Sequence, residues 1–277
     1  MNFFMNFIKK INTKTKIIAS ICLALSILTL SLITKQPRIE EVIETSSTLS
    51  NQKIGWGIKR NDNHIQPDLG ATNKKLIEQY NGIAMGSSEK NSIYLTFDAG
   101  YEAGHTEKIL DALKEKNVKA TFFITAHYLN TASNMVERMI NEGHIVGNHT
   151  SHHFSMPEIS DEKIKTELMT LNQAVYEKFG YEMKFMRPPK GEFSERTLAI
   201  TESLGFKTVM WSFAYVDWNE GAQPDRQDAI NKIVSNLHNG EIMLLHSTSK
   251  TNAEIMGELI DKVRQEGYEL KSLEEFN

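Results

Sequence analysis

The feature of this sequence that most constrains its fold is a regular alternation, after residue 90, of short apolar segments with longer amphipathic ones. The short segments are rich in β-branched and aromatic residues, which is typical of strands, and the longer ones carry apolar residues at helical spacing. Strands that alternate with helices form βαβ units, whose strands lie parallel in one sheet. The sequence therefore predicts an α/β fold. A series of about seven such strands favours a parallel (β/α) barrel, complete or incomplete, over an open sheet.

The predicted strands are Ser92–Phe97, Ala120–Thr125, His144–Gly147, Lys184–Arg187, Lys207–Phe213, Glu241–Leu245 and Tyr268–Leu273. The predicted helices between them are Glu107–Lys116, Ala132–Asn141, Asp161–Phe179, Ser194–Leu204, Arg226–His238 and Asn252–Glu266. A short helix is predicted at Asn73–Tyr80. Lys53–Gly70 has neither periodicity and is expected to be an extended lead-in packed on the domain. We expect one domain, residues 53–277.

An uncharged apolar segment, Ile17–Ile33, follows several lysines near the N-terminus. A run of about 17–20 apolar residues can cross a bilayer as a helix, and a basic flank is expected to stay in the cytoplasm. The segment is long for the apolar part of a cleaved signal peptide, which remains the alternative, and no small-residue cleavage site follows it. We predict a cytoplasmic N-terminus (1–16), a transmembrane anchor (17–34), a linker (35–52) and an extracytoplasmic domain.

The composition excludes some partners. The formal net charge is −4 and no basic stripe is present, so nucleic acid is not an expected ligand. The only cysteine, Cys22, lies within the apolar segment, so an intramolecular disulfide is impossible. No protein partner is predicted.

Three histidines are concentrated in His149–His153, on a turn between a predicted strand and a predicted helix. His149 and His153 can reach a common point, and neutral imidazole binds zinc and similar divalent metals. A solvated polar loop is the alternative interpretation of so short a motif.

Polar or aromatic side chains follow nearly every predicted strand. In a parallel α/β barrel, the residues that carry chemistry lie at the C-terminal ends of the strands. The residues at or after these ends are Asp98, His149, Arg187, Trp211, Asp217, Trp218 and His246. Each alone has a structural explanation, such as a helix cap, an ion pair or a core aromatic. Their joint position favours one site at one rim.

These motifs together resemble those of the NodB-like polysaccharide deacetylases, the family-four carbohydrate esterases, which have a distorted (β/α) barrel. The motifs are Thr96–Gly100, His149–His153, Arg187–Gly191, Val216–Trp218 and Leu244–His246. A more specific resemblance is to the delta-lactam-biosynthetic de-N-acetylases, which act on muramic acid in spore-cortex peptidoglycan. It rests on Trp56–Arg60, His64 and Ser249–Glu254. The resemblance covers about Lys53 to Leu273.

The resemblance implies hydrolysis of an N-acetyl amide. Asp98 would be the general base, and His246 would protonate the leaving nitrogen. Arg187 would orient Asp98, and Asp217 would tune His246. The remaining roles are assigned to His149 and His153 as ligands of a divalent metal, zinc or similar, and to Trp218, Tyr101, Pro188 and Trp211 as contacts to the glycan. Tyr101 is also expected to supply backbone N–H groups near the oxyanion.

The sequence departs from the family pattern at Ala99, where the usual first motif has a second, metal-binding aspartate. The delta-lactam branch also lacks this aspartate, so membership is not in question. This leaves two histidine ligands, with Asp98 as a further candidate, where three protein ligands are usual at a catalytic zinc. The sequence predicts a weakly bound metal.

The leading functional hypothesis is a membrane-anchored deacetylase of N-acetylmuramic acid in peptidoglycan, leading to the muramic delta-lactam. It would act in the cell envelope or forespore intermembrane space of a Gram-positive-type bacterium. The alternatives are a deacetylase of N-acetylglucosamine or chitin-type oligomers, and a glycan-binding protein that lost its metal through Ala99. Of the other histidines, His152 is expected to face substrate or solvent, and His64, His105, His127 and His144 are interpreted as loop or structural residues.

Overall fold

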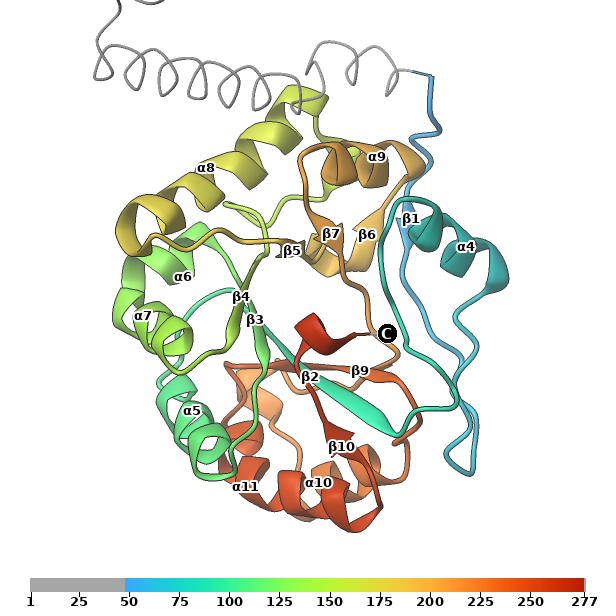
Figure 1. The fold of residues 1–277 in the computed structure, drawn as a ribbon, viewed down its shortest axis with the longest axis vertical. Coiled ribbons are helices and arrows are strands. Elements are labelled where there is room, and N and C mark those ends of the chain that lie inside the picture. The colour runs from blue at the N-terminus through green and yellow to red at the C-terminus, as the bar shows by residue number, and fades with distance from the viewer. Residues whose placement is uncertain (1–47, 277) are drawn as a thin grey trace, which may run out of the picture. The chain divides into compact units, whose positions relative to one another are not determined.

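A long buried strand, β2 (Ser92–Ala99), lies at the centre of the fold (Figure 1). The computed structural model of the chain describes residues 48–276. All 8 residues of β2 are buried. The reason is that β2 has strand neighbours on both sides and that helices cover the sheet. A strand in this position is mostly apolar and does not alternate between polar and apolar residues.

The other strands are β1 (Ile54–Gly55), β3 (Thr121–Ile124), β4 (Ile145–Asn148), β5 (Phe185–Met186), β6 (Glu192–Phe193), β7 (Lys207–Thr208), β8 (Phe213–Ala214), β9 (Glu241–His246) and β10 (Glu269–Leu270). The helices are α4 (Ala71–Gln79), α5 (Thr106–Glu115), α6 (Ala126–Thr131), α7 (Ser133–Asn141), α8 (Asp161–Phe179), α9 (Glu195–Ser203), α10 (Arg226–Val234) and α11 (Lys250–Gln265). Short 3-10 helices are η1 (Met156–Glu158), η2 (Pro189–Gly191), η3 (Glu220–Ala222) and η4 (Leu273–Glu275).

The main sheet is parallel and curls into a half-barrel (Figure 1). Its strand order is β7-β5-β4-β3-β2-β9-β8, and β10 pairs with the start of β2. The predicted parallel α/β architecture is therefore confirmed.

The predicted strand Lys207–Phe213 is wrong as a single strand. Its start is β7, which pairs with β5, and β8 begins at its end and pairs with β9. The two edges of the sheet are therefore consecutive in the sequence. Between them the backbone turns from one edge to the other, where the N–H of Val209 donates to Met186 (2.8 Å) and that of Ser212 to Ile242 (3.0 Å).

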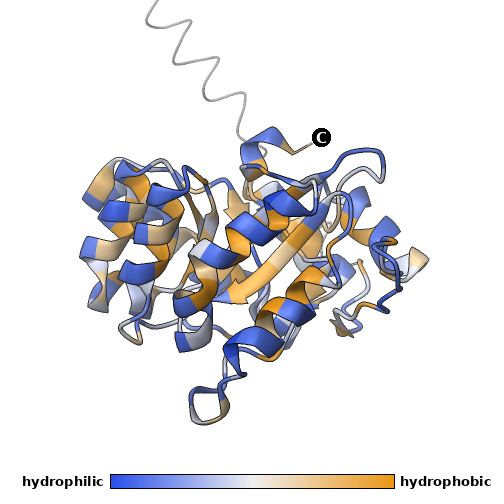
Figure 2. Ribbon diagram, turned by 90° about the horizontal axis from the view of Figure 1, so that it is seen from below, coloured by the Kyte–Doolittle hydropathy of each residue, from blue (hydrophilic) through white to orange (hydrophobic). Residues whose placement is uncertain are grey.

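The helices bury one face against the sheet, as their apolar spacing predicts. In α5 these buried residues are Ile109, Leu110 and Leu113. Figure 2 shows hydrophobic strands in the interior and helices whose outward turns are largely hydrophilic. The predicted start of α9 is also observed. The Ser194 hydroxyl accepts from the Thr197 N–H there and forms a capping box.

One helix was not predicted. α6 begins directly after β3, in a segment to which no element was assigned from the sequence, and the Thr125 side chain caps it by accepting from the Tyr128 N–H. The last predicted strand, Tyr268–Leu273, is reduced to the two residues of β10, followed by η4.

The lead-in packs on the domain as expected. β1 pairs antiparallel with β6, and Trp56 packs in a small apolar cluster with Phe193. The end of the predicted linker is also attached, because Asn51 accepts from the Ser194 hydroxyl at 3.0 Å and donates to the Pro157 carbonyl at 3.0 Å. Contacts of the domain therefore begin before residue 53.

Within residues 48–276, no helix is long and apolar enough to span a bilayer. The predicted cytoplasmic segment (1–16) and anchor (17–34) lie outside the described residues, as does most of the predicted linker.

Candidate active site

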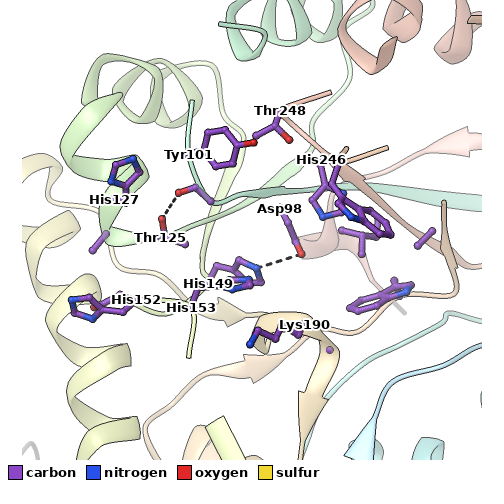
Figure 3. A pocket seen from close by; sticks show the side chains of 18 of the residues that line it. Asp98, Tyr101, Thr125, His127, His149, His152, His153, Lys190, His246 and Thr248 are labelled. Atoms are coloured by element: carbon purple, nitrogen blue, oxygen red, sulfur yellow. Dashed lines mark hydrogen bonds and ion pairs between the residues drawn. The ribbon is translucent and has the colours of Figure 1, made fainter. Parts of the chain in front are cut away.

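A groove of about 1250 Å³ lies at the C-terminal ends of the strands (Figure 3). The sheet register explains why separate motifs meet there. Asp98 at the end of β2 is paired with His246 at the end of β9, and Asn148, just before the histidine turn, is paired with Met186, just before Arg187. The predicted convergence of these side chains at one rim is observed.

Arg187 is fully buried beneath the groove. Its Nη1 donates to Asp98 Oδ1 at 2.9 Å, and its Nη2 donates to Thr96 Oγ1 at 2.8 Å. Its Nε donates to the Val209 carbonyl at 3.1 Å, and the guanidinium lies 4.3 Å from the centre of the Phe123 ring. These contacts fix the guanidinium, so Asp98 has a fixed orientation.

Asp98 is an anion in this environment. Burial raises its pKa, but the charge of His149 when this imidazole is protonated, together with the charge and hydrogen bond of Arg187, outweighs burial and lowers the pKa below the ordinary value. Since Arg187 is charged at all relevant pH values, the carboxylate stays ionised at neutral pH.

His149 presents one nitrogen to the groove. Its Nδ1 lies 2.8 Å from the Arg187 carbonyl, which can only accept, so Nδ1 carries the proton and Nε2 has a free lone pair. That Nε2 lies 3.5 Å from Asp98 Oδ2. The His153 ring is inclined at 66° to the His149 ring, with 4.8 Å between ring centres. Two imidazoles and one carboxylate therefore share one corner.

Both imidazoles are neutral at pH 7. Burial lowers the pKa of His149. Burial and the adjacent His149 lower the pKa of His153 to about 4. A neutral imidazole is the form that binds a metal.

The histidine turn is held by Glu167 of α8. The Glu167 carboxylate accepts from the His152 N–H at 2.7 Å and from His152 Nδ1 at 2.8 Å, and its carbonyl accepts from the Ser151 hydroxyl at 2.8 Å. Lys163 pairs with the same carboxylate at 3.1 Å. His152 thus bonds to the supporting helix, although it also lines the groove.

The donor set fits a divalent metal only in part. Among residues 48–276, no group of three or more His, Cys, Asp or Glu side chains is arranged to hold a metal ion. Ala99 belongs to the apolar core, on the face of β2 opposite to Asp98. His149 and His153 are the imidazole donors, and Asp98, already bonded to Arg187, is the neighbouring carboxylate.

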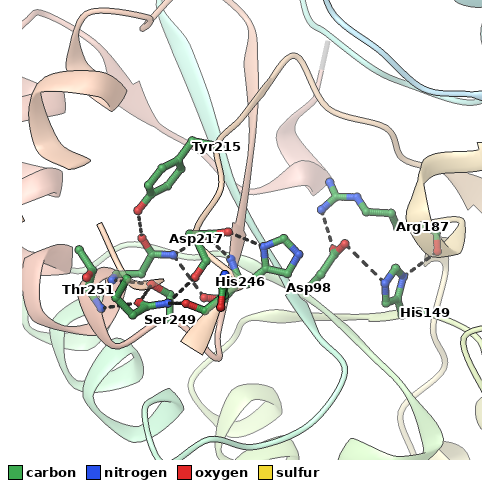
Figure 4. Close-up of polar contacts among 11 residues, drawn as sticks. Asp98, His149, Arg187, Tyr215, Asp217, His246, Ser249 and Thr251 are labelled. Carbon is green, nitrogen blue, oxygen red and sulfur yellow. Dashed lines mark hydrogen bonds and ion pairs between the residues drawn. The ribbon is translucent and has the colours of Figure 1, made fainter. Parts of the chain in front are cut away.

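On the other side of Asp98, His246 is paired with buried Asp217 (Figure 4). His246 Nδ1 donates to Asp217 Oδ1 at 2.7 Å, and the His246 N–H donates to Oδ2 at 2.8 Å. Asn252 also donates to Oδ2, at 2.6 Å, and its own amide oxygen accepts from Tyr215. Asp217 is therefore fixed by three donors, and His246 Nε2 is left for the groove.

The pKa of His246 is raised. Burial alone would lower it, but the hydrogen bond and charge of Asp217 more than compensate. Asp98 and His246 thus form an ionised carboxylate beside an imidazole that retains a proton more readily than usual. This pair can accept a proton at one position and donate one at another.

Three of the four predicted glycan contacts line the groove. Trp218 is 51% exposed and lies 5.4 Å from His246 between ring centres, and Tyr101 is 42% exposed with its hydroxyl bonded to Glu220. Trp211 also lines the groove. Pro188 is buried and does not line it, because the turn into η2 directs this ring into the protein.

Sequence reasoning missed several lining residues. They are Gly100, Thr125, Ala126, His127, Asn130, Ser151, Lys190, Gly191, Ala214, Leu244 and Thr248. His127, interpreted as structural, is exposed on α6 and lines the groove, which corrects that interpretation. The signal was available, since Thr125–His127 follows a strand end. Lys190 was quoted in a motif but given no role.

The fold and groove define a class, a parallel α/β half-barrel with an acid–base groove at its strand ends. A family model described as polysaccharide deacetylase matches residues 85–209. The peptidoglycan-N-acetylmuramic acid deacetylase PdaA of Bacillus subtilis is 40% identical over 231 residues, which cover 83% of this chain and 88% of that protein. The chain belongs to the polysaccharide deacetylases, carbohydrate esterase family 4.

A solved structure and a second relative support this family assignment. The structure of B. subtilis PdaA, a family 4 carbohydrate esterase, superimposes with a TM-score of 0.80 and covers 82% of this chain and 98% of that chain. A peptidoglycan-N-acetylglucosamine deacetylase of Bacillus cereus is 34% identical over 187 residues, covering 68% of this chain and 67% of that protein.

Proposed function

We propose that this protein hydrolyses the N-acetyl amide of N-acetylmuramic acid residues in peptidoglycan and releases acetate. The observation that carries the proposal is the 40% identity to PdaA, an N-acetylmuramic acid deacetylase, over 83% of the chain, together with an intact acid–base groove.

In the proposed reaction, water attacks the acetyl carbonyl carbon and Asp98 accepts the proton that the water loses. The bond from Arg187 keeps Asp98 ionised and oriented for this step. His246 then donates its proton to the amide nitrogen, the C–N bond breaks, and an amine and acetate result. Asp217 stabilises the protonated imidazole before this transfer.

His149 and His153 are the proposed ligands of a divalent metal, zinc or similar. When bound, such a metal polarises the carbonyl and lowers the pKa of water. Because Ala99 supplies no ligand, we expect weak binding. Dialysis against a chelator is expected to remove the metal and the activity, and added zinc to restore both. Measurement of metal content would contradict this if stoichiometric zinc remained after dialysis.

Sugar contacts are proposed for Trp218, Tyr101 and Trp211, whose side chains line the groove. Aromatic faces pack on the apolar faces of sugar rings and contribute buried area. The expected backbone donation from Tyr101 to the oxyanion stays a prediction.

The freed muramic amine can close onto the lactyl carboxylate when no peptide is attached, which gives the delta-lactam. A role in spore cortex, anchoring through residues 17–34 and an extracytoplasmic location belong to the same proposal. Fractionation of cells that express the full chain tests the anchor. Recovery with membranes is expected, and release by high salt alone would argue against it.

Incubation of the protein with intact peptidoglycan and with peptide-free glycan strands tests the activity. Mass analysis of the digested products should show loss of acetyl from muramic residues. Loss from glucosamine residues alone would favour the alternative that the B. cereus relative supports. Binding without acetyl loss at any metal concentration would favour a glycan-binding protein.

A further inference from the structure

Among the described residues that line the groove, Lys190 is the only lysine or arginine. The only carboxylate in that lining is Asp98, and its charge is already balanced by buried Arg187. The groove therefore carries one cationic group that its own acid does not neutralise. A cleft with a single uncompensated charge favours a substrate of the opposite charge.

No structural role explains why a lysine is present at position 190. Lys190 is exposed, and within the described part of the chain its ammonium forms no hydrogen bond or close ion pair; Glu192, the acid whose charge it faces, pairs with Lys53 at 3.6 Å. Figure 3 shows Lys190 beside the Asp98–His149 pair, on the side of the groove opposite to Tyr101. Lys190 therefore lies next to Asp98 and His149, two of the residues proposed to act on the acetyl group.

The backbone at Lys190 is also unfavourable for a lysine. Its φ is 59° and its ψ is 7°, in the left-handed region, where glycine or asparagine is the less costly residue. Such strain persists at positions where the surrounding structure fixes it and is concentrated at binding sites. Gly191 next to it cannot carry a side chain, since a Cβ there would lie 2.7 Å from the Trp211 ring. The turn thus presents one side chain, and that side chain is a cation.

We propose that Lys190 binds the lactyl carboxylate of the substrate and is a specificity-determining residue, an inference that rests on the proposed function. N-acetylmuramic acid differs from N-acetylglucosamine by a lactyl ether on the ring carbon next to the one that bears the acetamide. A carboxylate on that neighbouring carbon lies a few bonds from the scissile amide. A charge-assisted hydrogen bond from an ammonium group there distinguishes the two sugars and also favours the free acid over an amide.

The test uses the full chain and two substrates, peptide-free glycan strands with free lactyl carboxylates and the same strands converted to lactyl methylamides. The wild type is expected to have a kcat/KM about tenfold higher for the free acid, through KM, with the preference decreasing at high salt. Lys190→Gln is expected to lose the preference, Lys190→Arg to keep most of it, and Lys190→Glu to reverse it. Lys184→Gln, an exposed lysine outside the groove, is the matched control and is expected to behave as wild type.

Binding is measured separately in an Asp98→Asn background, where turnover is blocked, so that the two proposals fail differently. A wild type without preference for the free acid, or a Lys190→Gln variant that keeps it, overturns the role of Lys190 even if acetyl is released. A binding preference that depends on Lys190, without acetyl release by the wild type, supports Lys190 and overturns the proposed activity. If Lys190→Gln does not fold, the role of Lys190 is tested by the salt dependence of the wild-type preference and by the preference of the Lys190→Arg variant.

Discussion

The buried pair of Arg187 and Asp98 sets the charge of the groove at the level of single residues. A buried ion pair gives modest net stability, but removal of one partner leaves an uncompensated charge that costs about 3–5 kcal/mol. Arg187 also bonds Thr96 and two backbone carbonyls, so its position depends on the strands around it. The pair is therefore both structural and suited to chemistry.

Asp98→Asn is expected to lower kcat by about 10² to 10⁴, because the amide cannot accept a proton. The side chain remains isosteric, so glycan binding is expected to stay within a few-fold of wild type. Steady-state kinetics and equilibrium binding to the same strands measure the two effects. Activity comparable to wild type would remove Asp98 as the base.

Glu241 is another buried acid, away from the groove. Its Oε1 has no hydrogen-bond partner among the described residues, and its Oε2 accepts from the His238 N–H at 3.2 Å. Burial raises its pKa well above the ordinary value of 4.5. The folded state therefore retains this proton to higher pH than the unfolded state does.

This linkage predicts a pH-dependent effect of Glu241→Gln. Glu241 makes its complete contribution to the free energy of unfolding below pH 4.5. This contribution decreases as the pH rises from there toward the raised pKa, by at most about 1.4 kcal/mol per pH unit. The neutral variant is therefore expected to gain stability relative to wild type as pH rises. Urea unfolding at pH 5 and pH 8 measures this gain, and a constant difference at both would contradict the assignment.

At the scale of elements, the histidine turn and helix α8 act as one unit. The turn contains left-handed residues at Thr150 and His153, each of which costs about 1–2 kcal/mol. Glu167 compensates through its bonds to Ser151 and His152. The positions of His149 and His153, the proposed metal ligands, therefore depend on a residue that does not line the groove.

Glu167→Ala is expected to destabilise the fold by about 1–3 kcal/mol, because the N–H and Nδ1 of His152 lose their carboxylate acceptor, whereas the bond from Ser151 to the backbone carbonyl of residue 167 remains. The loosened turn is also expected to lower metal affinity by about tenfold. Glu177→Ala, an exposed position on the same helix, is the control. Unfolding curves and zinc titrations are the measurements, and unchanged zinc affinity in a folded Glu167→Ala protein would contradict the role of the turn.

At the scale of the whole molecule, the lead-in packs on the half-barrel where the chain passes from one sheet edge to the other. Trp56 Nε1 donates to the Trp211 carbonyl at 2.9 Å, in the segment that passes from β7 to β8. The Trp56 N–H also donates to the Gly191 carbonyl at 2.8 Å. A segment far away in the sequence thus helps to place Trp211 and the Lys190 turn.

Trp56→Ala is expected to cost about 3–5 kcal/mol of unfolding free energy, from lost burial and a lost bond. It is also expected to raise KM, since Trp211 loses its support. Ile65→Ala, at a lead-in residue that is 60% exposed, is expected to stay within about 0.5 kcal/mol of wild type. Thermal unfolding and kinetics on glycan strands test both, and an effect of Trp56→Ala no larger than that of Ile65→Ala would contradict it.

Local sequence patterns were enough to predict the parallel α/β class and the convergence of Asp98, His149, Arg187, Asp217 and His246 at one rim. Residue spacing sets strand and helix, and parallel strands end at the same edge of the sheet. The position of the sheet edges could not be predicted in this way, because curvature divides Lys207–Phe213 between two neighbouring strands that no local periodicity encodes. The tertiary structure decided this position, and it also decided that Pro188 is buried while His127 and Lys190 face the groove. The direction of a side chain from a turn depends on the backbone angles and packing of that turn, which spacing along the chain does not specify.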